Sequence, residues 1–323
     1  MPGKRFKRLL GAALLGSTLL AGAQALAATL VVGDQSFNNR TVMEAAGVLA
    51  GLPYSLEWKQ FTAGSPVAEA LNTGSLDVGL LGDAPPLFLG ALGAPIKVIG
   101  VSTQNLDGVA ILVRKDSPIR SLADLRGKNA AIWKGSWSQQ LLFTALERAG
   151  VSPDEVQLRY LGALDASHAL EGGAVDVIAT WEPYVTQQLR NGARVLTTAE
   201  GLIPAQSFVV ATDKAIADKR ELLGDFLRRL QQAREWVRQN PANSEKYADT
   251  WAELTRAERD IARRWFSSAA IRVRPIDDRA VAEAQRTVDF FSRIGLIKSY
   301  PAGSLFDASF NRYLQSPPAQ AAR

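Results

Sequence analysis

Residues 70–78 read Ala-Leu-Asn-Thr-Gly-Ser-Leu-Asp-Val, and residues 169–177 read Ala-Leu-Glu-Gly-Gly-Ala-Val-Asp-Val. Alanine, leucine, glycine, aspartate and valine coincide in the two stretches at a constant offset of 99 residues. Each copy predicts a helix that ends at glycine and is followed by a short apolar strand. The shared pattern indicates an internal duplication and therefore two structurally similar halves.

The two copies also correspond beyond the strand, at the same offset. Gly82-Asp83 aligns with Trp181-Glu182, and each acidic residue precedes a proline that favours the start of a helix. Ser65-Pro66 and Ser152-Pro153 also predict serine caps before a first-turn proline. The upstream strands correspond as well: residues 30–32 and 54–58 in the first half, 130–133 and 156–161 in the second.

Each half therefore follows a β-α-β-α-β-α order, which is typical of a mainly parallel sheet flanked by helices. The chain is predicted to be an α/β protein with two lobes and a cleft between them. In such sheets ligands bind beyond the carboxyl ends of the strands, and both halves would aim those ends at the cleft.

Two apolar segments, residues 109–113 and 208–211, flank the second half and are interpreted as a two-strand hinge between the lobes. Lobe one would then be discontinuous. The expected organisation is a signal peptide (1–27), lobe one (28–109 and 213–315), lobe two (114–207) and a disordered tail (316–323). From residue 213 onward the pattern is helical, with helices expected over 220–239, from 255–258 onward and over 280–294; these are assigned to packing.

The first 27 residues have the pattern of a cleavable export signal. Basic residues at 4, 5, 7 and 8 precede an apolar run over 9–20, and Ala25-Leu26-Ala27 supplies the small-x-small cleavage pattern. No later segment is long and apolar enough to span a bilayer. The chain has no cysteine, so a lipid-anchored cysteine is excluded and a free periplasmic protein is predicted, with release outside the cell as the alternative.

Charge and composition exclude several classes of function. The formal charge of +5 falls to about +1 without the four basic residues of the signal, so nucleic-acid binding is not indicated. One histidine and no cysteine make a transition-metal site improbable, and none is predicted. The chain has no phosphate-binding loop, no Gly-x-Ser-x-Gly elbow and no metal-binding histidine pair, so neither a cofactor nor an enzymatic activity is predicted.

Residues 132–142, Ile-Trp-Lys-Gly-Ser-Trp-Ser-Gln-Gln-Leu-Leu, suggest where a ligand is held. An apolar strand ends, Gly135 and Ser136 turn the chain, and a helix begins, so backbone N–H groups, serine hydroxyls and the positive end of a helix dipole converge. This favours binding of a small anion; simple capping of the helix by serine is the alternative. Micromolar affinity needs about 8 kcal/mol, more than one loop supplies, so the opposite lobe must also contribute.

Asp83 and Glu182 occupy equivalent positions of the repeat, before a helix start. Capping or orientation of neighbouring groups is favoured for them over acid–base chemistry, although either could contact a ligand amine. Trp137 and Trp181 flank the proposed anion seat. Their rings would either shield an apolar ligand tail or pack in the core.

Several motifs occur together in order along the chain: Gly64, Glu-Ala-Leu-Asn at 69–72, Gly-Ser-Leu-Asp at 74–77, Gly-Asp-Ala-Pro-Pro at 82–86, Lys-Gly-Ser-Trp-Ser at 134–138 and Trp-Glu-Pro-Tyr at 181–184. With them the chain resembles the periplasmic solute-binding proteins of ABC importers, in the group that binds aliphatic sulfonates and is related to taurine- and nitrate-binding proteins. The resemblance extends over residues 30–196.

The resemblance implies a type II periplasmic binding fold, in which two lobes close on a ligand and then dock on an inner-membrane permease. It implies a monomeric receptor for a small organic sulfonate, with taurine, nitrate or a pyrimidine precursor as alternative ligands and an enzyme on the same scaffold as a further alternative. Residues 40–53 form a shorter connection than is usual in the family. By resemblance and position, the ligand-binding residues are Gln35, Gly82, Asp83, Gly135, Ser136, Trp137, Ser138, Gln139, Trp181 and Glu182.

Overall fold

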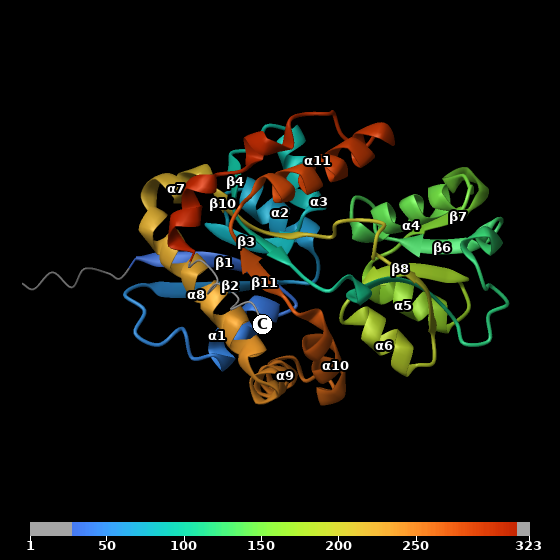
Figure 1. The fold of residues 1–323 in the computed structure, drawn as a ribbon, viewed down its shortest axis with the longest axis horizontal. Helices are drawn as coiled ribbons and strands as arrows, with labels where there is room; N and C mark the ends of the chain where they lie inside the picture. Colours follow the sequence, from blue (N-terminus) through green and yellow to red (C-terminus); the bar gives the residue numbers. More distant parts are fainter. Residues whose placement is uncertain (1–27, 315–323) are drawn as a thin grey trace, which may run out of the picture.

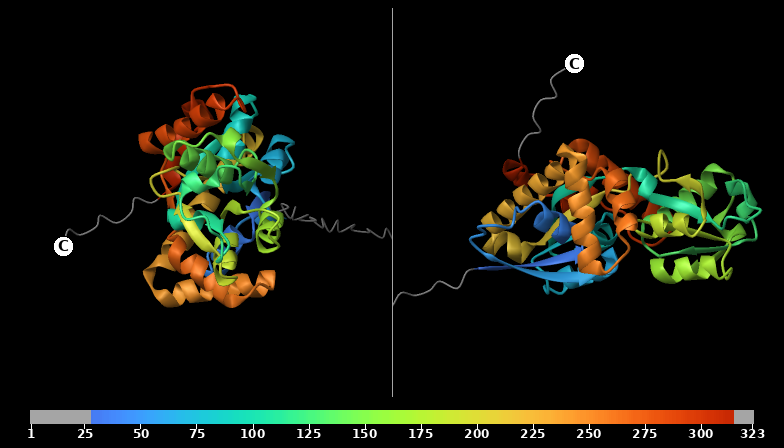
Figure 2. Two further views of the ribbon diagram at one scale, coloured as in Figure 1. Left: turned by 90° about the vertical axis from the view of Figure 1, so that its right-hand side faces the viewer. Right: turned by 90° about the horizontal axis from the view of Figure 1, so that it is seen from below.

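A computed structural model describes residues 28–314. The chain forms two α/β lobes side by side, each with its own central sheet (Figure 1). The views in Figure 2 show helices on the faces of both sheets and the narrower waist between the lobes. The predicted signal peptide and the tail from residue 316 lie outside the described residues.

The first lobe is built on a six-stranded sheet with the order β11-β4-β10-β3-β1-β2. β1 pairs parallel with β2 and β3, whereas β10 runs antiparallel between β3 and β4. The strands are β1 (Thr29–Gln35), β2 (Ser55–Phe61), β3 (Val78–Gly82), β4 (Ile96–Thr103), β10 (Ser207–Thr212) and β11 (Arg272–Arg274).

The second lobe has a five-stranded sheet with the order β7-β6-β8-β5-β9. β6 pairs parallel with β7 and β8, and β5 runs antiparallel between β8 and β9. The strands are β5 (Val109–Val113), β6 (Asn129–Ile132), β7 (Gln157–Tyr160), β8 (Val177–Trp181) and β9 (Arg194–Thr198).

The two sheets correspond strand by strand, so the predicted duplication is confirmed. The series β2-β1-β3-β10-β4 in the first lobe matches β7-β6-β8-β5-β9 in the second, including the inserted antiparallel strand. Helices α2 (Gly64–Asn72) and α5 (Ala163–Glu171) begin and end at residues 99 apart, the offset of the sequence repeat. The fold class predicted from the repeat is therefore the one observed.

The prediction that residues 109–113 and 208–211 are themselves the crossings between lobes is wrong. β5 lies wholly within the second sheet and β10 within the first. All five residues of β5 are fully buried, which requires sheet neighbours on both sides and is incompatible with an exposed hinge. The chain instead crosses at residues 104–108 and 199–206, which precede each of these strands.

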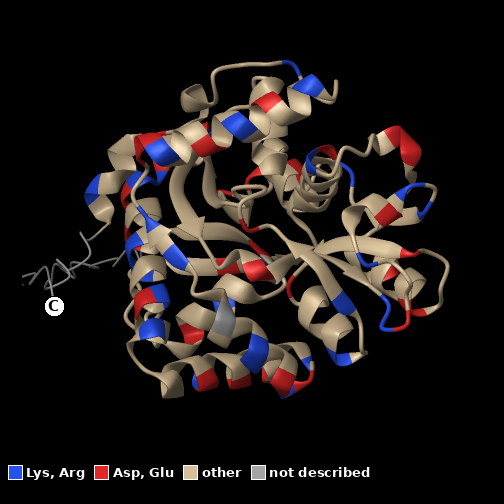
Figure 3. Ribbon diagram, turned by 45° about the vertical axis from the view of Figure 1, so that its right-hand side comes forward, with Lys and Arg blue, Asp and Glu red and all other residues tan. Residues whose placement is uncertain are grey.

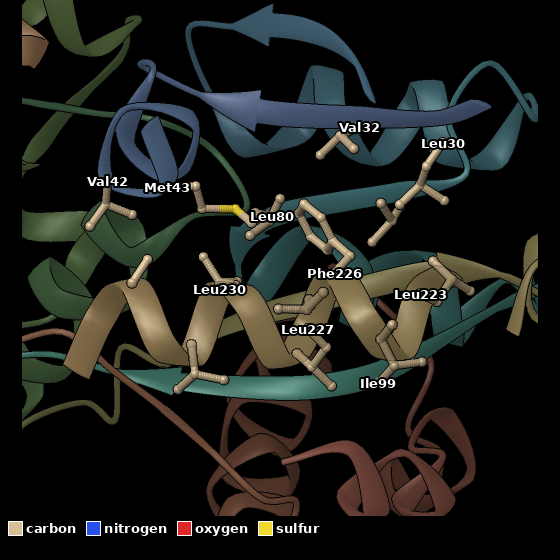
Figure 4. Close-up of a cluster of buried hydrophobic side chains, with 14 of the residues drawn as sticks. Leu30, Val32, Val42, Met43, Leu80, Ile99, Leu223, Phe226, Leu227 and Leu230 are labelled. Carbon is tan, nitrogen blue, oxygen red and sulfur yellow. The ribbon is translucent and has the colours of Figure 1, made fainter. Parts of the chain in front are cut away.

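The long helix α8 (Arg220–Gln239) covers one face of the first sheet and begins and ends where the sequence predicts. Leu223, Phe226, Leu227 and Leu230 recur at helical spacing and are fully buried, the apolar stripe of an amphipathic helix. Figure 4 shows them packed against side chains of β1, β3 and β4 in the core of the first lobe. Burial of this stripe holds α8 against the face of the first sheet.

The helices after α8 differ in part from the prediction. Helix α9 (Pro241–Thr255), which the pattern analysis passes over, is capped by the side chain of Asn240 and starts with proline. Thr255 ends α9 rather than opening the next helix. Two further helices follow, α10 (Arg259–Ala269) and α11 (Asp278–Arg293).

The remaining helices cover the sheets: α1 (Asn38–Ala45), α3 (Ala84–Ala91), α4 (Trp137–Arg148), α6 (Tyr184–Arg190) and α7 (Asp213–Asp218). The cap predicted at Ser152 is confirmed with its capping box, on a single 3-10 turn. The cap predicted at Ser65 is wrong, because α2 already begins at Gly64.

Charged residues of both signs alternate along the helices that surround the two sheets (Figure 3). Within residues 28–314 no helix is both long enough and apolar enough to cross a membrane.

Candidate ligand-binding cleft

A cavity of about 1050 Å³, including its open mouth, lies between the two lobes. The first lobe contributes residues from the ends of β1, β3 and β4, from the beginnings of α1 and α2, from β10, and from α8 and α10. The second lobe contributes residues that end β6 and β8 and begin the helices after them. The cavity therefore lies at the carboxyl ends of parallel strands from both sheets, the position expected for a ligand site.

Six of the ten predicted site residues line this cavity: Gln35, Gly82, Ser136, Trp137, Trp181 and Glu182. The other four, Asp83, Gly135, Ser138 and Gln139, are buried behind the surface of the cavity and support those that line it.

The turn between β6 and α4 is held together by its own hydrogen bonds. The Ser136 hydroxyl accepts from the Ser138 backbone N–H at 3.2 Å and donates to the Trp133 carbonyl at 2.7 Å. The Trp133 N–H donates to the Ser138 hydroxyl at 2.8 Å, and the Gly135 N–H donates to the Gln139 side-chain oxygen at 2.7 Å. The serines therefore cap the helix, and several of the donors expected to face an anion are engaged within the turn.

Trp137 reaches from the second lobe across to the first. Its indole Nε1–H donates to the Asp83 carboxylate at 2.7 Å, and its ring lies over Gly82, where an added Cβ would come within 3.2 Å of it. The Thr287 hydroxyl donates to the other Asp83 oxygen at 3.4 Å. Asp83 is fully buried, and this burial raises the pKa of its carboxyl to about 7.

Of the two roles predicted for Asp83, capping of the following helix is wrong, whereas orientation of a neighbouring group agrees with its hydrogen bond to Trp137. Asp83 stands at the N-cap position of α3, but its side chain makes no capping hydrogen bond there. The carboxylate is drawn instead to the indole of Trp137, a contact between lobes that no local sequence pattern records.

Glu182, the equivalent residue of the repeat, does cap its helix as predicted. Its two carboxylate oxygens accept from the backbone N–H of Thr186 at 3.0 Å and from the Thr186 hydroxyl at 2.8 Å. Burial raises the pKa of the Glu182 carboxyl, and the two Thr186 hydrogen bonds and the charge of Arg264 oppose that rise. Glu182 thus places a carboxylate in the wall that the second lobe contributes.

The turn between β1 and α1 carries backbone strain at the edge of the cleft. Ser36 and Phe37 both have left-handed backbone conformations, with φ of 54° and 58°. Hydrogen bonds hold this geometry: the Trp251 indole N–H donates to the Ser36 carbonyl at 2.8 Å, and the Phe37 N–H donates to Gln60 at 2.9 Å. This turn places Gln35 and Ser36 in the wall of the cavity.

The main charged residue missed by the pattern analysis is Arg234 of α8. It lines the cavity although its side chain is only 4% exposed. Its terminal nitrogens donate to the Tyr247 hydroxyl at 3.1 Å, to the Asn39 side-chain oxygen at 2.7 Å and to the side-chain oxygen of Asn38. Its Nε has no hydrogen-bond partner among the described residues. The wall of the cavity therefore contains a buried guanidinium, and a guanidinium forms strong hydrogen bonds with anions.

Arg234 is connected to a buried carboxylate through one intervening side chain. The Asn39 side chain, which accepts from Arg234, donates in turn to the buried carboxylate of Asp34 at 3.0 Å. Burial raises the pKa of the Asp34 carboxyl, and the positive charge of Arg234 opposes that rise.

A signal for Arg234 was present in the sequence. It follows Leu227 and Leu230 at the spacing of the buried stripe of α8, where an arginine is unexpected.

Aromatic side chains form much of the remaining wall. Trp133 and Trp181, at the ends of β6 and β8, have ring centroids 6.5 Å apart at an interplanar angle of 53°. Both are partly exposed and line the cavity, as does Trp265 of α10. Among residues 28–314, no three or more histidine or acidic side chains gather as a metal site would require.

Two α/β lobes joined by two crossings, with a cleft lined from both sides, define a two-lobed ligand-binding protein of the type that closes around a small molecule. The chain belongs to the NMT1/THI5-like family, whose model matches residues 54–244.

The chain is 37% identical over 209 residues to an Escherichia coli K12 protein named "Putative aliphatic sulfonates-binding protein"; the match spans 64% of this chain and 66% of that protein, slightly under two thirds. It resembles the crystal structure of the periplasmic aliphatic sulphonate binding protein SsuA from Escherichia coli, with a TM-score of 0.79 and 29% identity over 86% of this chain and 97% of that one. The alkanesulfonate-binding protein SsuA from Xanthomonas axonopodis pv. citri, bound to MOPS, matches with a TM-score of 0.80 and 28% identity over 87% and 98% of the two chains.

Proposed function

We propose that this protein is a periplasmic receptor that captures a small organic sulfonate in the cleft between its lobes and delivers it to an ABC importer in the inner membrane. The similarity to sulfonate-binding proteins over nearly their full length supports the ligand class. The observation that carries the proposal within this chain is Arg234, a buried guanidinium that lines the cleft with its Nε unpaired among the described residues.

A sulfonate matches this site because it is ionised at every relevant pH and offers three acceptor oxygens. It needs hydrogen-bond donors and no proton transfer. A hydrogen bond to a charged group contributes about 1.5–3 kcal/mol, so Arg234 supplies only part of the roughly 8 kcal/mol that micromolar binding requires. Further donors from both walls, and closure of the lobes, would supply the rest.

We propose binding without catalysis. The chain has no cysteine, and its single histidine, His168, belongs to α5 and is not among the residues that line the cleft. Export through a cleaved signal at residues 1–27 and function as a monomer complete the proposal. The permease would take the ligand when the lobes reopen.

The experiment is isothermal calorimetry of the mature protein with ethanesulfonate, benzenesulfonate, taurine, nitrate and sulfate. We expect micromolar binding of at least one sulfonate, and we expect Arg234→Gln to weaken it by about 10- to 150-fold, the equivalent of one charge-assisted hydrogen bond. The affinity of Arg234→Lys, which keeps the charge but loses the fork of donors, should lie between those of the natural protein and Arg234→Gln.

The matched control is Arg238→Gln, one turn further along the same helix, where the side chain is exposed and does not line the cleft. Its affinity should stay within twofold of the natural protein. Full affinity in Arg234→Gln would remove Arg234 from the site. Absence of binding by all five anions, with conversion of a co-purified compound detected by mass spectrometry, would replace the receptor with an enzyme.

A further inference from the structure

The cleft has two chemically different walls. The wall from the first lobe is mixed: it carries Arg234 and the hydroxyl side chains of Ser36, Ser65, Ser102, Thr103 and Ser207, beside apolar residues that include Phe208 and Trp265. The wall from the second lobe is aromatic, with Trp133, Trp137 and Trp181 beside Ser136 and Glu182. An amphipathic ligand has one orientation that suits both walls.

The charges of the two walls select where an anion lies. Arg234 draws a negative group to the first lobe, whereas the carboxylate of Glu182 repels one from the second. The Ser136 hydroxyl already donates to the Trp133 carbonyl, which reduces what the second lobe can offer an anion. The positive charge of Arg264 also acts on Glu182 and opposes part of this repulsion. The sulfonate head therefore belongs on the first lobe.

The opposite wall is shaped for a flat group. Trp133 and Trp181 are tilted against each other at 53° with ring centroids 6.5 Å apart, so the two rings do not stack on one another. Trp133 is fixed from behind, since its ring edge lies 3.3 Å from where a Cβ on Gly162 would stand. Both rings remain partly exposed and line the cavity. Aromatic faces held in this way attract a ring, through edge and offset-stacked contacts, more than a short alkyl chain.

We propose that the preferred ligand is an aromatic sulfonate, whose sulfonate group binds to Arg234 on the first lobe and whose ring lies against Trp133 and Trp181 on the second. This inference rests on the proposed function and narrows it. The first lobe would take up the charged head, and closure of the second lobe would cover the ring.

The test compares benzenesulfonate with ethanesulfonate by calorimetry on the mature protein. We expect benzenesulfonate to bind at least tenfold more tightly. If ethanesulfonate binds equally or more tightly, the aromatic preference is overturned while the receptor proposal stands. If neither sulfonate binds, the receptor proposal itself fails.

Trp133→Leu keeps an apolar side chain but removes the ring, so the ratio of the two affinities should fall from tenfold or more to less than threefold. The control is Trp236→Leu, on α8 and outside the cleft, which should retain the ratio. Equal losses for both ligands in Trp133→Leu would show a general structural role and overturn the inference.

A measurement on the unmodified protein guards against a variant that does not fold. Proton NMR of bound benzenesulfonate should show upfield ring-current shifts of its ring protons, which contact with two indole faces requires. Absence of such shifts at saturation would also overturn the inference.

Discussion

Replacing Asp83 by asparagine should remove one identified contribution to the pH dependence of the stability of this protein. Asp83 is fully buried, and burial raises its pKa from the ordinary value of 3.8 to about 7. The unfolded chain returns the carboxyl to water and to its ordinary pKa. Between these two pKa values the folded state holds a proton that the unfolded state has lost, so stability falls as pH rises from about 4 to 7 and the loss is complete above 7.

The size of the effect follows from the pKa difference. One pKa unit corresponds to about 1.4 kcal/mol, so Asp83 should cost the natural protein roughly 2.5 kcal/mol of unfolding free energy between pH 5 and pH 8. Asparagine is neutral at both pH values, so it contributes no such change. Its amide oxygen can still accept from the Trp137 indole, and its NH₂ can donate to the Thr287 hydroxyl, the two partners of Asp83.

The assay is urea unfolding of the natural protein and Asp83→Asn at pH 5, 6, 7 and 8 without ligand. Between pH 5 and pH 8 the free energy of unfolding should fall by roughly 2.5 kcal/mol less in the variant than in the natural protein. The variant should therefore be the more stable of the two at pH 8. Asp34 and Glu182 also have raised pKa values, but they are present in both proteins and cancel in the difference. The control Asp289→Asn, at an exposed position of α11, should run parallel to the natural protein. Parallel curves for Asp83→Asn would refute the argument that Asp83 is held in a desolvated site.

Two further substitutions probe the contact between the lobes and the cap of α4. Gly82→Ala places a Cβ within 3.2 Å of the Trp137 ring, so closure of the lobes should carry about 1 kcal/mol of strain. Sulfonate affinity measured by calorimetry should therefore fall about fivefold. Unchanged affinity would mean that the bound state does not bring Trp137 onto Gly82. Ser136→Ala removes the hydroxyl that accepts from the Ser138 N–H and donates to the Trp133 carbonyl. We expect the free energy of unfolding to fall by about 1 kcal/mol and the melting temperature by about 2–4 °C, with less than a threefold change in sulfonate affinity. A tenfold loss of affinity at unchanged stability would instead place that hydroxyl on the ligand.

The candidate site could be predicted in outline, because much of it follows from local patterns. Turns after parallel strands are recognisable from glycine, serine, proline and an acidic residue, and five residues of such turns do line the cleft, together with Gln35, which was named by resemblance. Glu182 behaves as its position predicts because a cap is an interaction with the next turn of the same helix. Asp83 has the same local signature and a different partner, because Trp137 comes from the other lobe.

The residues that escaped prediction are those whose role depends on distant parts of the chain. Arg234 lies 195 residues from Asn39, its hydrogen-bond partner at the edge of the cleft. It belongs to a helix that the pattern assigns to packing, and most of α8 does pack in the core. The prediction also places the crossings between the lobes wrongly, for a related reason. An apolar run of five residues reads as a strand wherever it pairs, and only the neighbouring strands decide which sheet it enters.

The sequence alone predicts the duplicated α/β pattern, the two lobes and the position of most helices and strands, since these follow from periodicity, capping and turn residues over short separations. The class of protein follows from the resemblance of its ordered motifs to a known family. The tertiary structure decided which strand joins which sheet, that Asp83 meets Trp137 across the cleft, and that a guanidinium from a packing helix enters the ligand wall. The physical reason is that burial, desolvation and contacts between lobes are properties of surfaces brought together by folding. No window of neighbouring residues contains them.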